Sequence, residues 1–202
     1  MKNYIQILGK RIKLTDEQVN EIKKGIADDK VTLGSIPEGE TCKIGDYEFI
    51  VLNHNTDSSE ILLKGLLHEE EKFASDNNFD GSSVDKLCET FYKVLARVVG
   101  KDSFVKHTVD LTSDDGLKHY GKVRRMMSLL TTEQYRQYVD ILDEYNPEKW
   151  WWLATPHSAP RHGNSSWVKC VSPFGDICSS RCGHINGVRP FCILKSDILI
   201  SK

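Results

Sequence analysis

The sequence predicts an α+β fold in which helices pack against a mainly antiparallel sheet. Three observations support this: a strand pattern within residues 47–64, two amphipathic helical patterns within 82–145, and a loop-rich C-terminal third. Hydrophobic residues make up 39% of the 202 residues, which suffices for a core. We expect a short N-terminal helical extension, residues 1–29, followed by one domain, residues 30–202.

The N-terminal extension carries a helix start signal. Thr15 and Gln18 have the spacing of a capping box, and Val19, Ile22 and Ile26 then mark one apolar face. A helix this short is marginal alone, so it should dock on a larger body. The helix would dock either on its own domain or on a second copy of the chain in a homodimer.

A β-hairpin is expected next. Residues 47–52 are rich in aromatic and β-branched side chains and follow a Gly-Asp turn signal. Residues 60–64 are the expected partner strand, across a turn at residues 53–59.

The strongest helical pattern begins at Ser82 and Ser83, and Gly100 supplies its stop. Apolar residues recur within it at three- and four-residue spacing. They are Val84, Leu87, Cys88, Phe91, Val94, Leu95 and Val98.

A second helix is expected from Thr132 to Tyr145, capped by Thr131 or Thr132. Pro147 ends it, because proline disfavours helical geometry at the preceding residue. The expected inward side chains are Tyr135, Tyr138, Val139 and Leu142.

The C-terminal third alternates short apolar runs with turn residues. Trp150 to Leu153 should form a core strand with side chains on alternating faces, because aromatic side chains of this size bury large areas. Residues 166–171 form a further expected strand, residues 172–175 a turn, and residues 188–194 a late strand with proline near its start. The segment 156–166 would be a loop displayed from this base.

Four segments together resemble a known domain family: DLTSDDGLKHYGKVRRMMSLLTTEQYRQYV, WWWLATP, WVKCVSPFGDI and NGVRPFCILKS. The family is an uncharacterised domain of unknown function, common in phages and prophages of low-GC Gram-positive bacteria. The resemblance covers roughly residues 38–200. More distantly, the layout is similar to the C-type-lectin fold of formylglycine-generating-enzyme-like proteins and phage variable tropism proteins. The resemblance implies a C-type-lectin-like sheet with two packed helices and binding through C-terminal loops.

The chain departs from the family pattern at two positions. Ala154 and Thr155 replace the more usual arginine and serine, so no ligand role transfers to them. The calcium motif of lectins is absent, so calcium-dependent sugar binding is not implied.

A zinc site is the sharpest enzymatic alternative. Cys178, Cys182 and His184 fall within seven residues, and zinc accepts Cys and His at short spacings. The spacing is not that of a standard zinc knuckle, so we expect no cofactor. Further ligands in this alternative would come from His157, His162 or Cys170. In a second alternative, Cys178, Cys182 and Cys192 would carry cysteine oxidation, as in the distant formylglycine-generating relatives.

In the leading interpretation all six cysteines are reduced thiols, most of them packed as small hydrophobic side chains, and Cys88 and Cys192 lie in strongly apolar patterns. Asp110, Asp114 and Asp115 are expected to stabilise a turn at Gly116, because the run lacks the closing Glu of a calcium loop.

Arg189 is expected to bridge backbone carbonyls of irregular loops with its five fixed donors. What remains is a display surface of exposed polar and aromatic residues, which we expect to bind a partner. These are Arg161, His162, Asn164, Trp167, Phe174, Arg181, His184 and Asn186.

Composition narrows the kinds of partner. The formal net charge is −2 and the one dense basic spot is Lys122, Arg124 and Arg125, so we expect no sequence-specific nucleic-acid binding. No apolar run reaches about 18 residues, so no membrane span is expected. The start MKNYIQILGKRIKLTDEQ lacks secretory signal features, so we expect a location in the cytoplasm of the bacterial host.

The function expected from these features is binding without catalysis by a phage- or prophage-encoded protein. Its partner would be a protein, in the leading interpretation a host defence protein, which would make the chain an anti-CRISPR-type inhibitor. The alternatives are a metal- or cysteine-dependent enzyme and a virion receptor-binding module.

Overall fold

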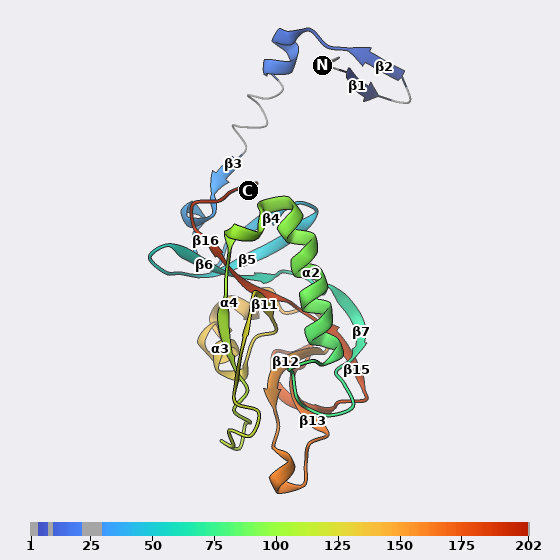
Figure 1. The fold of residues 1–202 in the computed structure, drawn as a ribbon, viewed down its shortest axis with the longest axis vertical. Coiled ribbons are helices and arrows are strands. Elements are labelled where there is room, and N and C mark those ends of the chain that lie inside the picture. The colour runs from blue at the N-terminus through green and yellow to red at the C-terminus, as the bar shows by residue number, and fades with distance from the viewer. Residues whose placement is uncertain (1–3, 8–9, 22–29, 202) are drawn as a thin grey trace.

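The computed structural model describes residues 4–7, 10–21 and 30–201 (Figure 1). The fold is α+β, as predicted, with mostly antiparallel strands. No helix of the described segments is long and apolar enough to cross a membrane.

Two sheets form the body of the described chain. The larger has the order β11-β16-β6-β5-β4-β17-β3, with β8 also paired to β16, and the smaller has the order β14-β13-β12-β15-β7. The strands of the larger sheet are β3 (Lys30–Thr32), β4 (Thr41–Ile44), β5 (Tyr47–His54), β6 (Ser58–Leu63), β8 (Phe104–Val105), β11 (Met127–Ser128), β16 (Phe191–Lys195) and β17 (Leu199–Ser201). Those of the smaller are β7 (His68–Lys72), β12 (Trp151–Pro156), β13 (Trp167–Val171), β14 (Ile177–Arg181) and β15 (Ile185–Val188).

The remaining elements are short, apart from one helix. A separate pair joins β9 (His107–Asp110) and β10 (Lys122–Arg125). The helices of the body are α2 (Ser83–Val99), α3 (Thr132–Gln137) and α4 (Val139–Asp143), with 3-10 turns η1 (Leu33–Ser35), η2 (Lys101–Ser103) and η3 (Pro160–His162).

Side chains on both faces of the strands are buried. Along β5, Phe49 and Val51 join one apolar cluster, whereas Ile50 and Leu52 join another. The first cluster includes α2 side chains and the second includes side chains of α3 and α4. The helices accordingly lie on opposite sides of the strands (Figure 1). The hairpin predicted from residues 47–64 is confirmed as β5 and β6.

Helix α2 is confirmed with its predicted ends. The Ser82 hydroxyl accepts a hydrogen bond from the Asp85 amide at 3.0 Å, and Gly100 follows with φ of 88°. Val94 and Val98 were predicted to face the core, but both are exposed. The stripe of apolar residues along α2 is therefore wider than the face that the helix buries.

The second predicted helix is interrupted. The capping box of Thr131 and Gln134 is present, but the chain leaves helical geometry at Tyr138 (φ −109°, ψ 13°), which separates α3 from α4. The Tyr138 hydroxyl donates to the Glu60 carboxylate at 2.7 Å. Val139, predicted to point inward, is exposed beyond this break. The prediction of one continuous helix was wrong because periodicity carries no information about a tether to a distant strand.

The predicted strand 188–194 is also divided. Residues 185–188 belong to β15 and residues 191–195 to β16, and these strands lie in different sheets. Arg189 and Pro190 make the crossing, and proline fits there because it has no amide hydrogen to pair.

Arg189 confirms its predicted structural role at this crossing. Its fully buried guanidinium donates to the carbonyl oxygens of Leu63, Lys64 and Tyr145 at 2.8–2.9 Å. It also lies over the Trp151 ring, 5.1 Å from the centroid. Burial lowers the pKa of Arg189 to about 10, so the group remains charged at neutral pH. One side chain thus connects both sheets to the segment that follows α4.

The N-terminal extension differs from the helical one predicted. It contains an antiparallel hairpin of β1 (Tyr4–Ile7) and β2 (Lys10–Lys13) before a helix at residues 16–21. The predicted capping box is present, with Thr15 and Gln18 bonded at 3.0 and 3.2 Å. Ile22 and Ile26 lie outside the described residues. Residues 22–29, which join this helix to the body, lie outside the described residues, so docking on the chain's own domain stays a prediction. The homodimer stays a prediction.

Candidate functional site

The adjacent tryptophans have different environments. Trp151 and Trp152 are fully buried in β12 and belong to different apolar clusters, which confirms the predicted core strand with alternating faces. Their indole N–H groups donate to the Asn146 side chain at 3.1 Å and to the Glu71 carbonyl at 2.8 Å. Trp150 was predicted to share this core, but it precedes the strand and its side chain is 43% exposed.

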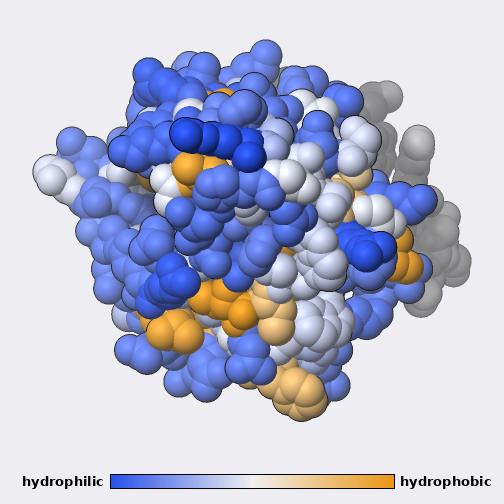
Figure 2. Space-filling view, turned by 90° about the horizontal axis from the view of Figure 1, so that it is seen from below, coloured by the Kyte–Doolittle hydropathy of each residue, from blue (hydrophilic) through white to orange (hydrophobic). Residues whose placement is uncertain are grey.

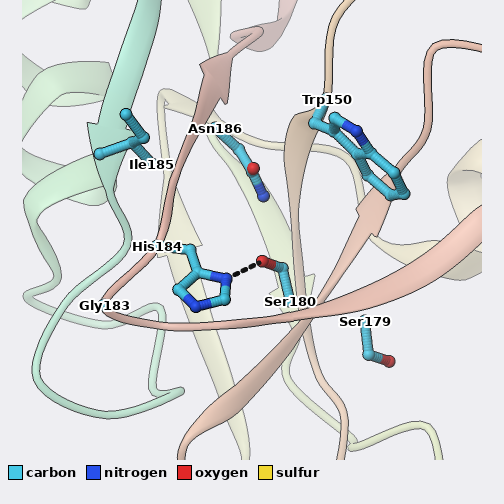
Figure 3. A pocket seen from close by; sticks show the side chains of 7 residues that line it. All are labelled: Trp150, Ser179, Ser180, Gly183, His184, Ile185 and Asn186. Carbon is cyan, nitrogen blue, oxygen red and sulfur yellow. Dashed lines mark hydrogen bonds between the residues drawn. The ribbon is translucent and has the colours of Figure 1, made fainter.

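Trp150 lies where two surface cavities meet. One, of about 500 Å³, is drawn in Figure 3, and its lining continues with Ser179, Ser180, Gly183 and His184. The other, of about 250 Å³, is also lined by Glu69, Glu70, Glu148, Lys149 and Pro173. Trp150, Ile185 and Asn186 line both. We call the lining of these two cavities, together with the adjoining Phe174, the Trp150 face.

The parallel pairing of β12 with β15 builds this face. The Gly187 amide donates to the Trp150 carbonyl at 2.7 Å, which sets Ile185 and Asn186 beside the indole. A Cβ at Gly187 would lie 2.5 Å from a terminal methyl group of Leu66, so a larger residue there would need the Leu66 side chain to move. On its other side β15 pairs with β7, which carries Glu69 and Glu70.

Asn186 is the unusual polar residue of the face. Its side chain is 7% exposed, and its amide nitrogen has no hydrogen-bond partner within the described chain. In Figure 3 the amide group lies between Trp150 and Ser180. Ser180 itself pairs with the His184 imidazole at 3.4 Å. A buried donor without a partner costs about 1–3 kcal/mol, so such groups in folded proteins call for an explanation.

Carboxylates surround the second cavity. Glu69 forms an ion pair with Lys149. Glu70 and Glu148 are exposed, and neither of them forms an ion pair with another described residue. This side of the face therefore carries a net negative charge.

The structure groups three of the eight predicted binding residues on this face. Asn186 and His184 line the first cavity, and Phe174, 88% exposed, follows Pro173 of the second at the tip of the β13–β14 turn. Trp167 and Arg181 instead stack on each other across β13 and β14, with the guanidinium 5.5 Å from the ring centroid.

The other three predicted residues, Arg161, His162 and Asn164, lie on the separate loop after β12. This loop is held by a buried asparagine. The Asn77 amide donates to the carbonyls of Ser158 at 2.7 Å and Trp167 at 2.9 Å. The predicted loop is present after β12, although Asn77 was not foreseen as its anchor.

The predicted aspartate turn is confirmed and fastens the same loop. Asp115 accepts hydrogen bonds from the hydroxyls of Ser113 and Ser158, and lies 2.9 Å from the His162 imidazole. These bonds, that of Ser113 foremost, hold the pKa of Asp115 well below its usual value. Gly116 has the left-handed geometry that the turn requires, with φ of 83°.

Comparison with known proteins finds no relative of this chain. No family model matches the chain, and no curated protein or solved structure matches it. The resemblance to phage domains and to the C-type-lectin fold therefore stays a prediction.

The residues of the zinc alternative do not form a ligand set. In the described segments, no three His, Cys, Asp or Glu side chains are grouped so as to hold a metal ion. Cys182 is buried, whereas His184 is exposed and pairs with Ser180. Cys178 lies opposite Cys170 across β13 and β14.

Most of the thiols are held in their protonated form. Burial raises the pKa of Cys42 and Cys170 to about 12 and that of Cys182 to about 11. Burial raises the pKa of Cys88 and Cys192 further, and both are fully buried as predicted. Because the thiolate is the reactive form, this burial disfavours Cys182 and Cys192 as the nucleophiles of the cysteine-oxidase alternative.

We expect Cys178 to react with a thiol reagent well before the other five cysteines of the folded protein. It alone is partly exposed, whereas the others are buried. Mass spectrometry after brief alkylation near neutral pH would locate the label, and denatured protein, in which all six cysteines are open, is the control. A second cysteine that reacts as fast in the folded protein would contradict the burial described above.

Proposed function

We propose that the chain is a non-catalytic recognition protein whose partner, another protein, docks on the Trp150 face. The observation that carries the proposal is the exposure of three apolar side chains from three separate segments at or next to this face. Trp150 and Ile185 line both cavities, and Phe174 follows Pro173, which lines the second. Trp150 is 43% exposed, Ile185 52% and Phe174 88%. Tryptophan is enriched among residues that dominate binding energy, and clustered exposed apolar groups mark interaction surfaces.

The surrounding surface supports this proposal. Seen from below, the surface is mostly hydrophilic, with several separate hydrophobic patches (Figure 2). The backbone bond from Gly187 to Trp150 fixes the base of the indole before any partner arrives. Prior fixation of this kind lowers the entropy lost on binding.

The partner class follows from the resemblance described above. We propose a C-type-lectin-like protein encoded by a phage or prophage, acting in the cytoplasm of a bacterial host. Its partner would be a host defence protein, as for an anti-CRISPR-type inhibitor. The net charge of −2 and the carboxylates beside Trp150 disfavour nucleic acid on this face.

Affinity capture with matched variants tests the proposal. The full chain, Trp150→Ala and Val98→Ala would be immobilised separately and exposed to the same cytoplasmic extract of the host. Val98 is a fitting control because it is an exposed apolar residue on α2, outside the Trp150 face. We expect a protein retained by wild type and Val98→Ala and lost with Trp150→Ala. Retention of the same proteins by all three would refute the proposed face.

A further inference from the structure

The Trp150 face combines an exposed aromatic ring with unpaired negative charge. Glu70 and Glu148 line the same cavity as Trp150, and neither has an ion-pair partner among the described residues. Glu69 is neutralised by Lys149. Electrostatics at this cavity therefore favours a cation, and the face of an indole attracts cations further.

The chain already uses this chemistry internally. Arg181 lies over Trp167 and Arg189 over Trp151, at 5.5 and 5.1 Å from the ring centroids. Trp150 has no such cationic partner in the described structure. Its ring is therefore open to a cationic group from another molecule.

Asn186 adds a requirement for a neutral acceptor. Asn186 lines both cavities and is only 7% exposed, and its amide nitrogen has no hydrogen-bond partner among the described residues. A backbone carbonyl is the acceptor that accompanies a cationic side chain in a peptide. The nitrogen itself has almost no exposed surface, so the side chains around it must shift for a carbonyl to reach it.

We infer that the Trp150 face binds a basic segment of the partner protein. A lysine or arginine side chain of that segment lies on the Trp150 indole between Glu70 and Glu148. A backbone carbonyl of the same segment accepts the hydrogen bond from Asn186. This inference rests on the proposed function and specifies the chemistry that the partner must present.

Other ligand classes satisfy fewer of these features. A neutral oligosaccharide could stack on Trp150 and accept from Asn186, but it would gain nothing from Glu70 and Glu148. A nucleic acid would bring phosphates next to those carboxylates, and like charges repel.

Selection from a random peptide display library tests the inference without a known partner. The library would be bound to the immobilised full chain after depletion on Trp150→Ala. We expect the selected peptides to be enriched in lysine or arginine relative to the starting library. Selection of neutral or acidic peptides, or no enrichment over the depleted library, would overturn the inference.

A synthetic copy of a selected peptide then locates the contacts, with binding measured by calorimetry. We expect affinity to fall at least ~5-fold in the double variant Glu70→Gln, Glu148→Gln, and severalfold in Asn186→Ala. Glu89→Gln, an exposed glutamate of α2, should leave affinity unchanged. Equal affinity in all of these variants would also overturn the inference.

The two proposals can fail separately. Trp150→Ala could lose the captured host protein while the selected peptides are not basic. That outcome would support the docking face and refute the basic segment. Capture that does not depend on Trp150 would remove the docking face itself.

Discussion

Replacement of Trp152 by alanine is expected to lower the free energy of unfolding by about 3–5 kcal/mol. The indole is fully buried and packs edge-on against Phe73, with ring centroids 5.5 Å apart. Its N–H also satisfies the Glu71 carbonyl, which would lose a partner. Urea unfolding followed by far-ultraviolet circular dichroism would measure the change.

Trp150→Ala is the matched control for this substitution. It removes the same side chain two positions earlier, where almost half of it is exposed. We expect a loss below about 1 kcal/mol, as for most surface substitutions. Equal losses for the two variants would mean that Trp150 is a core residue and that the proposed docking face is not a free surface.

The second large effect is expected at Arg189. Arg189→Met should lower the free energy of unfolding by about 3 kcal/mol or more, because three carbonyl oxygens, one buried and two partly buried, lose their donor. Methionine fills a similar volume, so little of the loss would come from a cavity. The same urea titration measures it.

Two further substitutions serve as a control and as a conservative comparison for Arg189→Met. Arg161→Met changes an exposed arginine and should stay within about 0.5 kcal/mol of wild type. Arg189→Lys keeps the charge but loses the planar set of donors, so its stability should fall between those of wild type and Arg189→Met. An Arg189→Met protein as stable as wild type would show that the desolvation cost of the charge cancels its three hydrogen bonds.

The elements that were predicted correctly are those whose ends are determined by residues close together in the sequence. Helix α2 begins at the Ser82 cap and ends at Gly100, and both ends depend on neighbouring residues alone. The same holds for the capping boxes at Thr15 and Thr131 and for the turn at Gly116.

The elements that were missed depend on contacts between distant residues. Tyr138 leaves the helix where its hydroxyl meets Glu60, which lies 78 positions away. Arg189 divides the late strand because it bonds carbonyls more than 40 positions distant. No pattern within a short window contains these contacts.

The candidate site shows the same division. Phe174 and His184 were recognisable as exposed turn residues. Asn186 was also predicted to be exposed, but this was wrong because β15 buries it between β12 and β7. Trp150 was assigned to the core with its neighbours. A signal was present, because Trp150 directly follows the charged residues Glu148 and Lys149. The convergence of β7 with Trp150 was not predictable, since it arises from the pairing of β12 and β7 with β15.

Oxidative footprinting of the complex with the captured partner tests the central claim most directly. Hydroxyl radicals would be applied to the free chain and to the complex, and the modified residues identified by mass spectrometry. We predict that Trp150 and Phe174 are modified in the free chain and protected in the complex, while Trp151 and Trp152 remain unmodified in both. Equal modification of Trp150 in the free chain and in a saturated complex would contradict the account.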